Sequence, residues 1–268
     1  MYTEYQPSHL LAPYIDNYWE FKGNPEYGMR IHILPDGCTD FIFTLGEVAN
    51  AVEEGSLIMQ PYRSYFVGPM TKYSELVTYT ESIHMFGVRF LPCGLSCFTN
   101  LPLHEFVNSR VSTNEMKAVF DDTFIEKLGE QKHVTDRIRV VEEYLLAYLA
   151  RHYQPADSHV AMAVNMINHS KGKRSVRSLM DDVCLCQRHF ERKFKHYTGF
   201  TPKEYSRIVK FKNAVELLRT TTSANLLTTA VDAGYYDLAH FSKEIKSMSG
   251  NTPASFLSLT VPEETTLT

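Results

Sequence analysis

The sequence predicts an α+β protein of two domains, a β-rich N-terminal domain followed by an all-helical C-terminal domain. The first observation is a series of short runs rich in β-branched and aromatic residues before about residue 90. The second is a change to the spacing of an amphipathic helix from about Thr113 onward. The third is charge, since residues 1–154 carry 12 Lys and Arg against 20 Asp and Glu, whereas residues 155–260 carry 15 against 9. An acidic front half joined to a basic back half predicts two functions on one chain.

The composition excludes several classes of protein. The 268 residues are 44% hydrophobic and 22% charged, as in soluble globular proteins of one or two domains. No run of about 18 apolar residues predicts a membrane span, and the N-terminus lacks the pattern of a secretory signal, so we expect a cytoplasmic protein with no membrane partner. The net charge of −4 alone counts against nucleic acid. It is the sum of −8 for residues 1–154, +6 for residues 155–260 and −2 for residues 261–268. We expect this acidic tail to be flexible. The five cysteines are expected to be free thiols: Cys38, Cys93, Cys97, Cys184 and Cys186.

Short strands separated by turns are predicted for the front half. The clearest turn is Pro35-Asp36-Gly37, which has Pro and Gly at the positions that a turn favours. Strands at this spacing are typical of a sandwich or barrel, and a barrel of this size encloses side chains or one small ligand. The predicted strands are 30–34, 40–45, 57–59, 65–67, 75–79 and 85–90.

A helix predicted at 136–152 ends the N-terminal domain, which we place at residues 1–154. Its apolar residues recur at spacings of three and four, and this stripe either covers the barrel or also pairs with a second subunit. Pro155 ends the helix, because the residue before a proline is pushed out of the α region. No convincing strand follows in the C-terminal domain at 155–260.

The back half contains an internal repeat with an offset of 51 residues. His189-Phe190 aligns with His240-Phe241, and Lys195 with Lys246. Gly199 aligns with Gly250, and Thr201-Pro202 with Thr252-Pro253. Many coincidences at one offset indicate two copies of one helical unit.

Each copy predicts a helix, a short turn and a second helix. The predicted helices are 176–183 and 187–197 in the first copy, and 226–233 and 238–247 in the second. Gly234 suits the second turn, and Asp237 is a favourable N-cap residue. This arrangement is typical of a helix-turn-helix motif, whose second helix can enter the major groove of DNA.

A long helix is predicted to join the two copies. Gly199 and Gly250 are expected to cap the second helices, and Thr201-Pro202-Lys203-Glu204 predicts a capping box that opens the connecting helix. Two groove-entering helices on a rigid spacer could lie one duplex turn apart, about 34 Å, and contact successive major grooves. The net charge of +6 would supply attraction to phosphate.

These motifs resemble the DNA-binding domain of the AraC family of bacterial transcription regulators, over about 156–259. The resemblance is carried by residues 188–195 (RHFERKFK), 199–202 (GFTP), 234–241 (GYYDLAHF) and 250–253 (GNTP). It implies a seven-helix domain with two helix-turn-helix motifs. The base-facing positions that it implies are Arg188, Glu191, Arg192, Ala239, Ser242 and Lys243. The phosphate-contact candidates are Lys195, His189, His240 and Lys246.

The first motif departs from the family pattern at three positions. Met180 is bulky where two helices approach, and Cys184 replaces the usual turn glycine. Cys186 is a poorer N-cap residue than serine. Whether the first motif keeps the standard geometry is therefore open.

The front half resembles the β-rich, cupin-like sensor domain of one AraC subgroup. The matching stretches are 33–40 (ILPDGCTD), 66–69 (FVGP) and 87–92 (GVRFLP). The resemblance implies a sensor and dimerisation role, and aromatic residues near the start of the chain either line a ligand pocket or pack the core. The ligand-pocket candidates are Trp19, Tyr27, His32, Phe41 and Phe43.

Neither a catalytic site nor a metal site is predicted. His32 and His84 do not form a recognised ligand pattern, and a single Cys184-Leu185-Cys186 triplet is a weak metal motif. Asp36 and Asp40 flank a turn without a nucleophile motif, so we interpret them as turn residues. No cofactor is implied.

The predicted function is a sequence-specific DNA-binding transcription regulator that responds to a signal through its N-terminal domain. A small-molecule effector, a homodimer and a contact with RNA polymerase are compatible with this prediction. The alternative is an enzyme fused to a DNA-binding domain, either a DNA-repair alkyltransferase or a cupin-type enzyme. The alkyltransferase requires about four closely spaced front-half cysteines, whereas Cys38, Cys93 and Cys97 are spread out.

Overall fold

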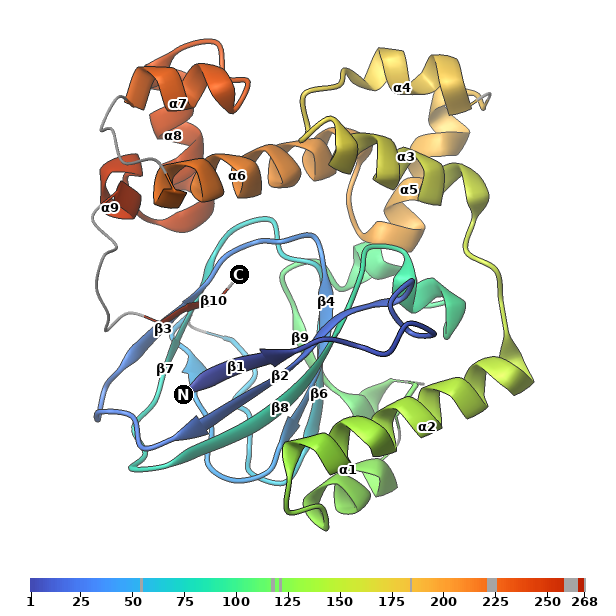
Figure 1. The fold of residues 1–268 in the computed structure, drawn as a ribbon, viewed down its shortest axis with the longest axis vertical. Helices are drawn as coiled ribbons and strands as arrows, with labels where there is room; N and C mark the ends of the chain where they lie inside the picture. Colours follow the sequence, from blue (N-terminus) through green and yellow to red (C-terminus); the bar gives the residue numbers. More distant parts are fainter. Residues whose placement is uncertain are drawn as a thin grey trace.

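Two sheets form the N-terminal domain of the computed structural model (Figure 1). The structure describes residues 1–53, 55–116, 119–120, 122–183, 185–220, 226–257 and 265–267. The six-stranded sheet has the order β1-β2-β8-β4-β6-β9 and the four-stranded sheet the order β10-β3-β7-β5. The strands are β1 (Tyr2–Tyr5), β2 (Ile15–Gly23), β3 (Arg30–Ile33), β4 (Thr39–Thr44), β5 (Asn50–Ala51), β6 (Ser64–Val67), β7 (Ser74–Val77), β8 (Ile83–Phe90), β9 (Arg110–Ser112) and β10 (Thr265–Leu267).

Two apolar cores lie on opposite faces of the six-stranded sheet, because side chains alternate along each strand. Phe41 and Phe43 of β4 pack with Phe120 and Phe124, beneath helices α1 (Asp122–Gly129) and α2 (Val134–His152). Ile42 points the other way, into the core between the two sheets. The apolar stripe of α2 therefore covers the sheet.

Seven helices make up the C-terminal domain within the described residues (Figure 1). Their apolar faces form a third core of the protein. The helices are α3 (Ser158–His169), α4 (Val176–Val183), α5 (Gln187–Thr198), α6 (Pro202–Thr220), α7 (Leu226–Asp232), α8 (Leu238–Ser249) and α9 (Pro253–Leu257). None of the described helices is long and apolar enough to cross a membrane.

The fold class predicted from the sequence is confirmed, with a sheet domain preceding a helical domain. The strand predicted at 57–59 is wrong, because these residues form a loop. The Met59 N–H donates to the side-chain Oδ1 of Asn50 and not to the backbone of a neighbouring strand. Strand β2 was not predicted. Residues 265–267 of the expected flexible tail instead form β10, which pairs in parallel with β3.

The connecting helix α6 rests on the turn that the sequence predicts at 35–37. Gly37 has φ +87°, and the ring of Tyr205 lies where a side chain at this position would begin. The Lys212 ammonium donates to the carbonyl oxygen of Asp36 at 3.5 Å. The two domains are therefore in direct contact through α6.

Candidate nucleic-acid interface

Helices α5 and α8 occupy equivalent positions in the two copies of the repeat. Both are 12 residues long, and their bounds differ by the 51 residues of the sequence offset. Phe190 and Phe194 of α5 are fully buried, as are Phe241 and Ile245 of α8. Because these pairs are four residues apart, each helix buries one face and leaves the opposite face free.

The C-terminal ends of the two helices share the same hydrogen bonds. The Thr198 hydroxyl donates to the Phe194 carbonyl at 2.7 Å, and the equivalent Ser249 hydroxyl donates to the Ile245 carbonyl at 2.7 Å. Both helices then end at a left-handed glycine, Gly199 with φ +84° and Gly250 with φ +75°. The capping box that opens α6 is confirmed by bonds between Thr201 and Glu204 in both directions.

The N-terminal ends of α5 and α8 differ. Asp237 caps α8 by accepting the His240 N–H at 2.7 Å, whereas Cys186 precedes α5 without a side-chain capping bond. Met180 packs against the core without interrupting α4. Cys184 lies outside the described residues. The first motif thus keeps a second helix as long as that of the second motif while lacking its cap.

The base-facing candidates differ in how free their side chains are. Arg188, Arg192, Ala239 and Lys243 are exposed, whereas Glu191 and Ser242 are half-buried. The side chain of Arg188 makes no hydrogen bond or ion pair with any other described residue. Nη2 of Arg192 lies 3.3 Å from Nδ1 of His189, and Glu191 accepts the Gln187 amide at 2.8 Å. Among the base-facing candidates of α5, Arg188 therefore has the side chain most available to a ligand.

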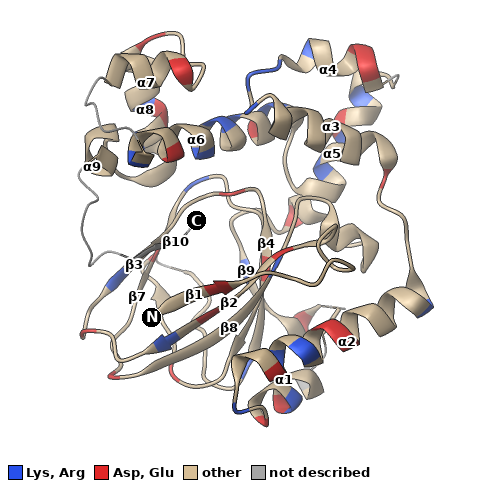
Figure 2. Ribbon diagram, viewed as in Figure 1, with Lys and Arg blue, Asp and Glu red and all other residues tan. Residues whose placement is uncertain are grey.

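The phosphate-contact candidates lie on the same two helices. Lys195 and Lys246 are exposed at equivalent repeat positions. His240 is exposed beside the ring of Tyr235, with ring centroids 5.5 Å apart, and His189 is half-buried. Figure 2 shows further Lys and Arg on α6 and on the connection between α3 and α4. These basic residues surround the two helix-turn-helix units.

The orientation of the two helices leaves their N-terminal residues accessible. In Figure 1, α5 runs from α4 toward the sheets and α8 from α7 toward α9. Their C-terminal glycines contact the N-terminal domain, Gly199 at Pro69 and Gly250 at Tyr73. The N-terminal residues of a recognition helix are those that contact base edges, so the docked N-terminal domain leaves them uncovered.

The cavity between the two sheets has a volume of about 40 Å³, close to that of one water molecule. Trp19 lines it, and its ring lies against Gly87, where a side chain would clash. Phe41 and Phe43 face the helix-covered side of the sheet, so their assignment to a pocket is corrected. Tyr27 is 78% exposed, and the His32 ring stacks on Tyr73 with centroids 5.8 Å apart. Of the five pocket candidates, the structure places Trp19 at this cavity.

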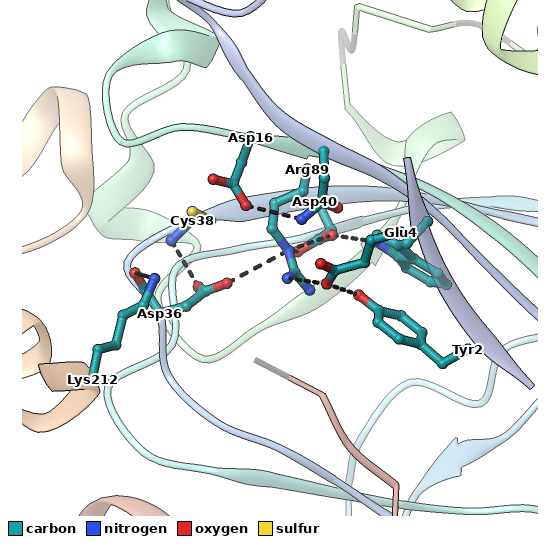
Figure 3. A network of polar contacts seen from close by, with 10 residues as sticks. Tyr2, Glu4, Asp16, Asp36, Cys38, Asp40, Arg89 and Lys212 are labelled. Atoms are coloured by element: carbon teal, nitrogen blue, oxygen red, sulfur yellow. Dashed lines mark hydrogen bonds and ion pairs between the residues drawn. The ribbon is translucent and has the colours of Figure 1, made fainter. Parts of the chain in front are cut away.

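A buried polar network closes one end of this cavity (Figure 3). Nε of Arg89 lies 3.3 Å from Oδ1 of Asp40 and 3.5 Å from Oδ2 of Asp36. The indole N–H of Trp19 donates to Asp40 at 2.7 Å. Burial raises the pKa of the Asp40 carboxyl although the positive charge of Arg89 opposes the shift. Through the Asp36 turn, the network continues to Lys212 of α6.

The interpretation of Asp36 and Asp40 as turn residues is half correct. Oδ1 of Asp36 accepts the Cys38 N–H at 2.8 Å, as a turn residue does. Asp40 lies within β4 and forms the network with Arg89 and Trp19. Neither Arg89 nor Lys212 is predicted as a site residue from the sequence, because their partners lie 49 and 176 residues away and no local pattern marks such pairs.

Within the described parts of the chain, no three His, Cys, Asp or Glu residues are grouped to hold a metal ion. His84 instead contacts Glu20 at 2.9 Å. Cys38, Cys93 and Cys97 are buried free thiols, and burial raises the pKa of each. Such thiols are poor nucleophiles, because the thiolate is the reactive form.

Comparison with protein families gives a match for each domain. Residues 3–112 match a domain of unknown function (DUF6597), and residues 179–258 match a helix-turn-helix domain. The second match begins within α4 and extends through α9, so it includes the second helix of both copies of the duplicated motif. No curated protein matches the chain.

Solved structures resemble all or part of the chain. ToxT from Vibrio cholerae aligns over 90% of this chain and 97% of its own, with a TM-score of 0.52 and 9% identity. ToxT from Vibrio cholerae O395 bound to (E)-4-(8-methylnaphthalen-1-yl)but-3-enoic acid aligns over 89% and 96%, with a TM-score of 0.51 and 9% identity. A probable AraC family transcriptional regulator from Rhodopseudomonas palustris aligns over 40% of this chain and 100% of its own, with 20% identity and a TM-score of 0.36. The likeness to ToxT shows a shared fold.

Proposed function

We propose that the protein is a sequence-specific DNA-binding transcription regulator, because residues 179–258 match a helix-turn-helix domain and the duplicated motif resembles that of the AraC family. Helices α5 and α8 enter two successive major grooves of one duplex. The observation that carries this proposal is the structural equivalence of these helices, with matching lengths, buried faces and C-terminal glycines. A rigid α6 between them holds their separation fixed.

Base recognition is assigned mainly to the first motif. Arg188 and Arg192 carry guanidinium groups, which form paired hydrogen bonds with O6 and N7 of guanine. In the second motif, Ala239 offers a methyl contact to thymine and Ser242 one hydrogen bond, while Lys243 suits guanine. The half-buried Glu191 suits the amino group of cytosine once Gln187 releases it.

Lys195 and Lys246 are proposed to contact phosphate. Replacing Lys195 by alanine should weaken binding to all duplexes alike, and the slope of log affinity against log salt should fall by about 1. Fluorescence anisotropy across a salt series measures this slope for the preferred duplex and for an unrelated one. Lys127→Ala, at an exposed site on α1, removes the same charge far from DNA and should change neither. A loss confined to the preferred sequence would show that Lys195 contacts a base.

The N-terminal domain is proposed to regulate DNA binding in response to a small molecule. ToxT, which shares the fold, has been solved with a bound organic acid. In this chain, α6 and the ends of α5 and α8 all touch the N-terminal domain. A change there can therefore alter how the two recognition helices are presented. Such a regulator acts where its DNA is, in the cytoplasm, and homodimer formation and contact with RNA polymerase are compatible with this role.

Selection of duplexes from a random pool tests the proposed function. At fixed salt, the full-length protein should enrich a defined sequence and bind it roughly 10³-fold or more tightly than unrelated DNA. Equal weak affinity for every duplex, including DNA from upstream of its own gene, would refute sequence-specific regulation. Arg188→Ala serves as the matched variant, since it should enrich a less defined sequence.

A further inference from the structure

One loop of the N-terminal domain contacts the ends of both recognition helices. This loop, residues 68–73 between β6 and β7, places Pro69 against Gly199 and Tyr73 against Gly250. A methyl group at Gly199 would lie 2.6 Å from Cγ of Pro69, and one at Gly250 would lie 2.7 Å from Cζ of Tyr73. The Tyr73 N–H also donates to the Met248 carbonyl at 2.8 Å. Movement of this loop would therefore act on both helices at equivalent positions.

Hydrogen bonds with Asn108 hold the loop in place. The side-chain oxygen of Asn108 accepts the Thr71 N–H at 2.8 Å, and its own backbone N–H donates to the Pro69 carbonyl at 2.9 Å. Its Nδ2 donates to the Thr71 hydroxyl at 2.8 Å. Asn108 adopts φ +57°, a left-handed conformation that asparagine tolerates better than most residues. The position of loop 68–73 thus depends on the segment that leads into β9.

A cavity of about 390 Å³ lies between this loop, the segment that leads into β9, and residues 53 and 55–57. This volume falls within the range of small-molecule sites. Lys72 and Tyr73 line it from the loop, and Asn108 and Arg110 from the segment below. Anything bound there touches the residues that connect the loop to β9.

Arg110 gives this cavity its chemical character. It begins β9 opposite Val67, and its Nη2 donates to the Ser74 hydroxyl at 2.7 Å, across to the other sheet. No carboxylate among the described residues forms an ion pair with it. Burial lowers the pKa of its guanidinium, although Glu53 and Asp40 oppose the shift from a distance. A guanidinium removed from water in this way gains most from a bound anion.

Arg110 is half-buried, and the two fully buried arginines of the N-terminal domain, Arg89 and Arg137, differ from it in having carboxylate partners. Arg89 has Asp36 and Asp40 beside it, and Arg137 has Glu20 at 2.9 Å. Opposite Arg110, Lys72 pairs with Glu53 at 3.1 Å, but both of these side chains are largely exposed. The cavity therefore presents two cations and one exposed carboxylate, with serine and asparagine groups between them.

We propose that this cavity is an effector site for a small organic anion whose carboxylate or phosphate oxygens pair with Arg110 and reach Lys72. Binding of the anion shifts loop 68–73, and this loop in turn displaces the C-terminal ends of α5 and α8 that it contacts. The effect of anion binding on DNA affinity rests on the proposed function, whereas the anion-binding site itself does not depend on it. A bidentate contact of an oxyanion with the Arg110 fork supplies affinity and orientation.

Calorimetric titration of the full-length protein tests the site, with inorganic phosphate in one arm and succinate in the other at constant ionic strength. At least one probe should bind, and Arg110→Gln should weaken that binding at least tenfold. Arg63→Gln removes the same charge at an exposed site and should bind like the wild type. If Arg110→Gln fails to fold by thermal unfolding, Arg110→Lys keeps the charge but loses the fork, and should weaken binding several-fold. The arm that binds more tightly identifies the oxyanion.

The coupling is tested by a variant that leaves Arg110 intact. Pro69→Ala removes the ring that lies against Gly199 at the end of α5, and Pro69 does not line the cavity. This variant should bind the anion as the wild type does, whereas the change in DNA affinity on adding the anion should be smaller. Absence of binding by both probes, or unchanged binding by Arg110→Gln, would overturn the site. An unchanged DNA response in Pro69→Ala would overturn the coupling. Sequence-specific DNA binding is measured without anion, so failure of the regulator function would be seen separately.

Discussion

Replacing Arg188 by alanine is expected to weaken binding to the preferred duplex by about 1–3 kcal/mol, roughly 5- to 150-fold in affinity. The reason is that Arg188 is exposed on α5 and is not engaged by any other described side chain, so its guanidinium is free for guanine. Fluorescence anisotropy against duplexes with each base substituted measures the effect. The loss should be concentrated at one base pair, where the variant accepts all four bases almost equally.

Arg151→Ala is the matched control, because it removes the same charge from an exposed site near the end of α2. It should leave the sequence preference unchanged. A uniform loss of affinity in Arg188→Ala, for the preferred duplex and for unrelated ones alike, would make Arg188 a phosphate contact. Base recognition by α5 would then have to rest on Arg192 and Glu191.

Replacing Arg89 by methionine should lower the free energy of unfolding by about 3–5 kcal/mol, because it leaves buried carboxylates without their counter-charge. Asp40 keeps only the Trp19 bond among the partners described above, and Asp36 keeps the Cys38 N–H. Chemical denaturation monitored by the single tryptophan measures the change. The exposed Arg63→Met is the control and should cost far less.

The loss of unfolding free energy in Arg89→Met, called the deficit below, should depend on pH. Burial already raises the pKa of Asp40, and loss of Arg89 raises it further. A carboxyl group with a folded pKa above its unfolded value, about 3.9, stabilises the fold only while protonated. The deficit relative to Arg63→Met should therefore be smallest at acid pH and grow as the pH rises through the folded pKa. A deficit independent of pH would mean that Arg89 acts by packing alone.

Local signals made the helical half predictable from the sequence. The glycine after each recognition helix and the Thr-Pro pair that follows specify where one helix ends and the next begins. The repeat then supplied two independent estimates of the same boundaries, and the 51-residue offset holds in the structure for α5 and α8. The predicted ends, at 197 and 247, fell short because the final turn depends on the Thr198 and Ser249 hydroxyl bonds.

The sheet half was less predictable because its pairing is non-local. Strand β2 pairs with β8, 60 to 75 residues further along the chain, and its sequence Asp16-Asn17-Tyr18-Trp19 lacks the polar–apolar alternation that marks a strand. Alternation in β4 shows that Phe41 and Ile42 face opposite sides, but not which side is covered by α1 and α2. Phe41 and Phe43 were therefore assigned to a pocket although they lie under helices.

The contacts between the domains left no pattern in the sequence. The bond from Tyr73 to Met248 joins two backbone groups, which every residue carries. Arg110 was invisible for a related reason. An isolated arginine at the start of a short strand is unremarkable until the fold shows that no described carboxylate forms an ion pair with it.

The spacing of the two contacted segments on DNA tests the central claim most directly. Hydroxyl-radical footprinting of the full-length protein on its preferred duplex should show two protected segments about 10–10.5 base pairs apart, one for each recognition helix. Inserting about half a turn of DNA, roughly 5 base pairs, between them should abolish the second footprint and reduce affinity toward the non-specific level. If one segment alone is protected, or the insertion has no effect, α5 and α8 do not contact the duplex together.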